Sequence, residues 1–145
     1  MTKPLTDAVD EALEKGTVTI EAGSKKAIVD VTDLDRIGVV VGRIRVEGHS
    51  DSLPIQSQRL QSSLRPNGEP LVTTELDPNL GGSVLRSDPK HMRGGRFFQV
   101  AIDPTGSELT RHHVSDDGQR HKKDFSLTRD QLREIIDAMD GSQTP

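Results

Sequence analysis

The sequence predicts an α+β domain: a mainly antiparallel sheet with a C-terminal three-stranded meander, packed by N- and C-terminal amphipathic helices. Two observations lead to this prediction. Three runs of alternating residues between 96 and 125 are separated by hairpin-length turns, which is typical of an antiparallel meander. Near both ends of the chain, apolar residues recur with a helical period. Apolar stripes of this kind require a sheet face to lie on.

The clearest single element is a C-terminal helix that begins after Thr128. Thr128 and Gln131 have the spacing of a capping box, in which each side chain bonds the backbone of the other residue. Four apolar side chains then follow at i, i+3, i+4 and i+7: Leu132, Ile135, Ile136 and Met139. We expect this helix to close the meander by packing on Phe98, Val100 and Ile102.

The other elements are read from the same periodicities and from turn residues. The expected helices are at 4–15 and 52–65, and the expected strands are at 17–21, 27–31, 37–47, 71–76, 83–86, 96–103, 107–114 and 119–125. The chain of 145 residues is expected to form one domain over 1–145. The Pro- and Gly-containing stretch 66–70 is the place where two sub-blocks could meet.

Composition narrows the classes of function. The chain has no Cys, which excludes disulfides, thiol nucleophiles and zinc–thiolate sites. It has no apolar run long enough for a signal peptide or a membrane span, so we expect a soluble, cytoplasmic protein with no membrane partner. The net charge is −4, but residues 86–123 hold eight Lys or Arg against five Asp or Glu, whereas residues 124–145 hold two against five. The basic segment is therefore the candidate binding region.

Motifs for catalysis and for cofactors are missing from the sequence. There is no phosphate loop, dinucleotide-binding turn, zinc-binding helix or nucleophile elbow. No catalytic residue, cofactor or metal ligand is therefore predicted. One alternative is a metal-dependent or hydrolytic enzyme built on four His residues: His91, His112, His113 and His121. His112 and His113 are adjacent on an expected strand, so their side chains should point to opposite faces.

The basic segment offers a second alternative, single-stranded nucleic-acid binding through a cationic sheet face with an exposed aromatic ring. The candidate binding residues are Arg93, Arg96, Phe97, Arg111, His113, Lys122 and Lys123. The negative net charge and the low aromatic content of 2% disfavour nucleic acid. We therefore predict a small non-catalytic binding or adaptor module of unknown ligand. A protein partner or a homo-oligomer is the expected partner.

Overall fold

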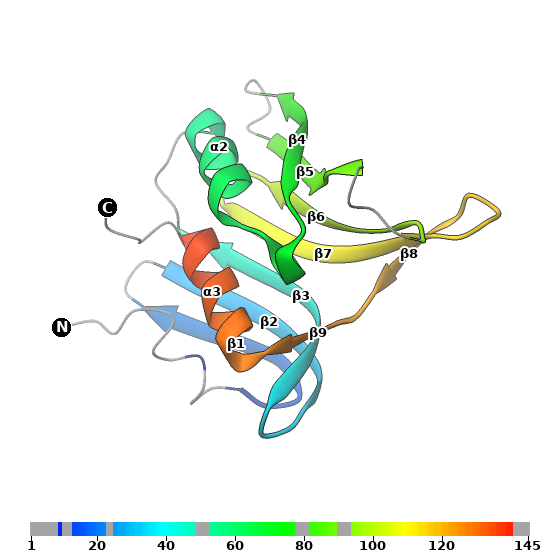
Figure 1. Cartoon of the computed structure of the whole chain (residues 1–145). Coiled ribbons are helices and arrows are strands. Elements are labelled where there is room, and N and C mark those ends of the chain that lie inside the picture. The colour runs from blue at the N-terminus through cyan, green and yellow to red at the C-terminus, as the bar shows by residue number, and fades with distance from the viewer. Residues whose placement is uncertain are drawn as a thin grey trace.

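The computed structural model describes residues 9, 13–22, 25–48, 53–77, 82–89 and 94–140. The strands of this part of the chain are β1 (Gly16–Ala22), β2 (Lys25–Leu34), β3 (Gly38–Glu47), β4 (Leu71–Asp77), β5 (Gly82–Ser87), β6 (Arg96–Ile102), β7 (Gly106–Val114), β8 (Arg120–Lys123) and β9 (Phe125–Thr128). Its helices are α2 (Leu53–Ser63), the short 3₁₀ helix η1 (Pro66–Gly68) and α3 (Arg129–Asp140) (Figure 1).

These strands form one sheet in the order β1-β2-β3-β7-β6-β5-β4, with β8 paired to β7 and β9 paired to β3. Every pair is antiparallel. The predicted α+β class, the first hairpin and the meander of β6, β7 and β8 are confirmed. Residues 66–70 contain η1, and strands from both sides of this stretch belong to the same sheet.

The start of α3 has the predicted capping box. The Gln131 amide N–H donates to Thr128 Oγ1 at 3.0 Å, and the Thr128 amide N–H donates to Gln131 Oε1 at 2.8 Å. The whole predicted apolar stripe is buried, from Leu132 at 0% to Ile135 at 4% exposed. The local sequence therefore determines both where this helix begins and which face it buries.

The expected position of α3 over the meander is wrong. The helix packs on β3 and β9, beside α2 and η1. The cause is β9, in which Phe125 and Leu127 pair with Val41 and Val39 of β3. The chain has already crossed to β3 when the helix begins. Contact with the meander is kept by Phe125, whose ring lies edge-on to that of Phe98 with centroids 5.2 Å apart.

The expected packing by N- and C-terminal helices is also replaced. The two α-helices within the described ranges are α2 in mid-chain and α3 near the C-terminus. The helix expected at 4–15 lies outside the described residues, apart from Val9, which is helical and fully buried, and residues 13–15. The mid-chain helix α2 takes part in the packing and buries polar as well as apolar side chains. Ser57 is 3% exposed, and its hydroxyl is hydrogen-bonded to that of Ser83 at 2.8 Å.

The two sides of the sheet differ in kind. Both described α-helices pack on the side that carries Phe98, Val100 and Ile102, which belong to the main core cluster (Figure 1). We call the other side the open face, because neither described α-helix packs on it. The hairpin of β7 and β8 projects past the helices at one end of the sheet (Figure 1). The open face is thus the broad surface on which polar side chains from several strands can meet.

Candidate functional site

One half of the open face, over β2, β3 and β7, is a network of paired charges. Arg43 Nε lies 3.0 Å from Asp30 Oδ2, and Arg43 Nη1 lies 3.2 Å from Glu108 Oε1. Arg45 Nη2 lies 3.0 Å from Asp103 Oδ2. Burial alone would raise the pKa of Asp103, but hydrogen bonds from Arg45 and from the following turn hold it well below its usual range. This half of the face is electrostatically satisfied.

The other half, over β5, β6, β7 and β8, contains two guanidinium groups without acidic partners. Arg86 Nε donates to Gln99 Oε1 at 3.0 Å, and Arg120 Nη2 donates to the same oxygen. Within the described ranges, neither guanidinium is paired with a carboxylate. Strand register explains their meeting, because Arg86 pairs directly with Gln99 while the long side chain of Arg120 crosses from β8.

The aromatic ring of Phe97 packs against two side chains of this half of the face, His112 and Arg120. Phe97 is 5% exposed although it lies on the open face and outside the main core cluster. Its ring stacks with the His112 imidazole at a centroid distance of 5.4 Å and an interplanar angle of 24°. The Arg120 Cζ atom lies 5.1 Å from the Phe97 centroid, within cation–π range. The apolar ring is therefore covered by the side chains that it supports.

His112 is neutral at pH 7. Burial lowers its pKa, and the nearby charges of Arg120, Lys122 and Arg86 lower it further, to about 4. Its Nε2 atom shares a hydrogen bond of 2.8 Å with the Thr110 hydroxyl. Burial is the larger cause of the low pKa, and the three cations add to it.

We call this group the Arg86–Arg120 site. It consists of Arg86, Gln99, His112, Arg120 and Lys122, packed over Phe97. Burial lowers the pKa of the Arg120 guanidinium, and the positive charge of Arg86 lowers it further. Both effects disfavour the charged form, so a bound anion would relieve an existing electrostatic cost. Chemically, the arrangement is suited to hold an oxyanion.

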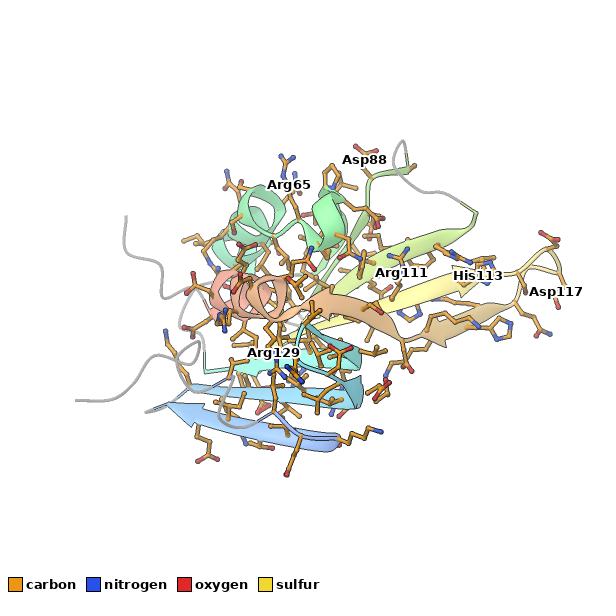
Figure 2. All side chains as sticks on the ribbon, turned by 60° about the horizontal axis from the view of Figure 1, so that its bottom comes forward. Arg65, Asp88, Arg111, His113, Asp117 and Arg129 are labelled. Atoms are coloured by element: carbon orange, nitrogen blue, oxygen red, sulfur yellow. The ribbon has the colours of Figure 1, made fainter. Side chains whose placement is uncertain are left out.

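The predicted binding residues are divided between the two sides of the sheet. Phe97 and Lys122 belong to the Arg86–Arg120 site, whereas Arg93 lies outside the described residues. The other four line an open hollow of about 390 Å³ on the helix side, together with Asp124: Arg96, Arg111, His113 and Lys123. Figure 2 shows Arg111 and His113 on the strands of the meander.

The helix-side hollow is less strongly cationic than the number of basic residues in its lining suggests. Arg111 Nη1 lies 3.2 Å from Glu69 Oε2, and its guanidinium lies over the Phe98 ring with Cζ 4.3 Å from the centroid. Asp124 brings a further carboxylate to the lining. Arg111 is thus held by packing and by an ion pair, and the excess positive charge comes from Arg96 and Lys123.

The His residues do not gather into one described cluster. His113 pairs with His121 across β7 and β8, so these two share a side of the sheet, while His112 points to the open face. His91 lies outside the described residues. Within the described part of the chain, no group of three His, Cys, Asp or Glu side chains could hold a metal ion. The expected opposition of His112 and His113 is confirmed by the strand register.

Sequence reasoning missed Arg86, Gln99 and Arg120 as partners in one site. Arg86 lies in a short strand, and Gln99 is uncharged. Neither feature by itself indicates a binding residue. A signal was present in the period of two, since Phe97 and Gln99 occupy alternate positions of one strand. To place Gln99 beside Arg86 and Arg120, one must know how β5, β6, β7 and β8 are aligned with one another. Turn lengths alone do not determine this alignment.

The fold and the site together define an antiparallel α+β domain with a cationic cluster on a sheet face. None of the helices in the described part of the chain is long and apolar enough to cross a membrane. No family model matches the chain, and no curated protein or solved structure matches it either.

Proposed function

We propose that the protein is a non-catalytic binding module whose Arg86–Arg120 site receives an anionic group of a protein partner. One observation carries this proposal: two guanidinium groups, from Arg86 and Arg120, converge on a neutral amide oxygen. On the same face, Arg43 and Arg45 are each satisfied by carboxylates of the chain itself. The negative charge that the first pair lacks would come from the partner.

A protein partner fits the site better than a single-stranded nucleic acid. Base stacking needs an aromatic face that is free to receive a base. Phe97 is 5% exposed, and its ring contacts are taken by His112 and Arg120. Phe98 is fully buried in the core. The aromatic platform that motivated the nucleic-acid alternative is therefore occupied within the protein.

The proposal is tested by neutralising two cations on each side of the sheet. Arg86→Gln with Lys122→Gln changes the open face, and Arg96→Gln with Lys123→Gln is the matched control for the hollow on the helix side. Binding of a fluorescein-labelled, Glu-rich peptide is measured by anisotropy at increasing salt concentration. We expect the open-face variant to lose affinity by about tenfold, which corresponds to roughly 1.4 kcal/mol.

Three results would count against the proposal. Loss of affinity only in the control variant would show that the peptide binds in the helix-side hollow and not at the Arg86–Arg120 site. Equal affinity in all variants would show that neither cationic surface is used. Affinity that does not fall with salt would be inconsistent with recognition of charge. Sedimentation of the free protein at low and high salt tests whether a second copy of the chain is the acidic partner.

A further inference from the structure

We propose that the anionic group received at the Arg86–Arg120 site is a phosphate monoester on the partner protein, held between the two guanidinium groups above Gln99. This inference rests on the proposed function and names the chemistry of its ligand. Three features support it: the hydrogen-bonding capacity left at the site, the concentration of charge at one point, and the burial of the Phe97 ring.

Hydrogen-bonding capacity favours a ligand with several oxygens. Each guanidinium has five N–H groups, and the Gln99 oxygen accepts one bond from Arg86 and one from Arg120. The remaining N–H groups of both side chains have no hydrogen-bond partner among the residues that the structure describes. Guanidinium groups bind phosphate through pairs of parallel hydrogen bonds, so two of them can engage several oxygens of one phosphate group.

The concentration of charge favours a dianion. Arg86 and Arg120 meet at a single atom, and both they and Lys122 act on the same imidazole of His112. A phosphate monoester carries a charge of about −1.5 to −2 at pH 7, whereas a carboxylate carries one unit. A dianion therefore offsets more of the mutual repulsion between these cations than a Glu or Asp side chain of the partner.

The same geometry favours a phosphate monoester over a nucleic-acid backbone as the ligand. A single-stranded nucleic acid presents one charge per nucleotide, and binding proteins meet it with a cationic groove and with stacked aromatic side chains. Here the cations gather around one oxygen, and Phe97 is covered by His112 and Arg120. The site resembles a receptor for one phosphate group more than a track for a chain of them.

The experiment uses the full chain and four peptide or nucleotide probes. The probes are a phosphoserine peptide, the same peptide with Ser, the same peptide with Glu, and a mixed single-stranded DNA oligonucleotide of similar charge. Inorganic phosphate is titrated separately to detect binding of the group alone. Affinity is measured by calorimetry, and the side-chain N–H signals of Arg86 and Arg120 are followed by NMR. We expect the phosphoserine peptide to bind about tenfold or more tightly than the Glu peptide.

Gln99→Glu is the decisive variant because it places a carboxylate where the two guanidinium groups meet. The change is almost isosteric, so the fold should be retained, and the new internal ion pairs should raise the melting temperature. The phosphoserine peptide should then lose affinity by about tenfold or more, since the negative charge comes from the protein itself. Gln58→Glu is the matched control, because it makes the same chemical change at an exposed position of α2.

The outcomes separate this inference from the proposed function. Equal affinity for the phosphoserine and Glu peptides would refute the phosphate assignment and leave the binding module intact. Tighter binding of the oligonucleotide would refute it in favour of nucleic acid. Unchanged affinity in Gln99→Glu would refute the site itself. Binding of none of the probes, inorganic phosphate included, would overturn both the inference and the proposed function.

Discussion

Replacing Leu132 by Ala tests whether α3 is part of the core or an appendage to it. The Leu132 side chain is fully buried and faces the cluster that joins α3 to β3 and β9. The substitution removes three carbon groups, each worth about 0.8 kcal/mol on transfer from water. A cavity then adds to this loss, and Leu→Ala substitutions in cores cost about 2–5 kcal/mol in total. We expect a decrease in the free energy of unfolding within that range.

The effect should extend to the whole domain, because one cluster contains side chains from α3 and from strands at both ends of the sheet. Urea unfolding is followed by far-UV circular dichroism and by backbone NMR signals of β5 and α3. Glu134→Ala is the control, since its side chain is exposed on the same helix and should change stability by less than about 0.5 kcal/mol. Loss of the α3 signals while β5 keeps its wild-type midpoint would show that the helix is a separate unit.

Three further predictions concern a cap, a turn and a titration. Thr128→Ala should cost about 1 kcal/mol by removing the acceptor at the start of α3, with Thr128→Ser, which keeps it, near wild type in urea unfolding. Gly95→Ala should cost about 2 kcal/mol or more, because Gly95 has φ +71° and a Cβ would lie 2.6 Å from the Val114 carbonyl oxygen; a wild-type melting temperature would contradict this. His112 should titrate near pH 4 by NMR, and because its folded pKa is below the unfolded value of 6.5, its contribution to stability should fall as the pH drops through that interval. His112→Gln should then lose less stability than wild type between neutral pH and pH 4.5, and a measured pKa above 6 would refute the argument.

The parts of the fold that the sequence predicts are those specified by neighbouring residues. The capping box of α3 and the meander require only spacing along the chain. The position of α3 depends on β9, whose partner β3 lies far away in sequence. Phe125 and Leu127 show an alternating pattern, but alternation does not identify which strand they join. Local periodicity thus predicts elements well and their long-range pairing poorly.

The candidate site was only partly predictable for a related reason. A basic segment can be recognised from its composition, which predicts Lys122, and Phe97 is predicted as an aromatic residue within that segment. Composition does not separate the two sides of a sheet, so the same reasoning also selects Arg96 and Arg111 from the helix side. Gln99 could not be found by charge at all, since its importance comes from accepting bonds from two cations.

Phe97 connects the fold to the proposed function in a way that differs from its expected role. An exposed ring on a basic sheet would suggest stacking with a ligand. Instead, Phe97 is buried on the open face because His112 stacks on it and Arg120 crosses it. These contacts restrict the rotamers of two long or polar side chains, so less conformational entropy remains to be lost when an anion binds. In the proposed function the ring would favour binding by preorganising Arg120 and His112, and a ligand need not touch it.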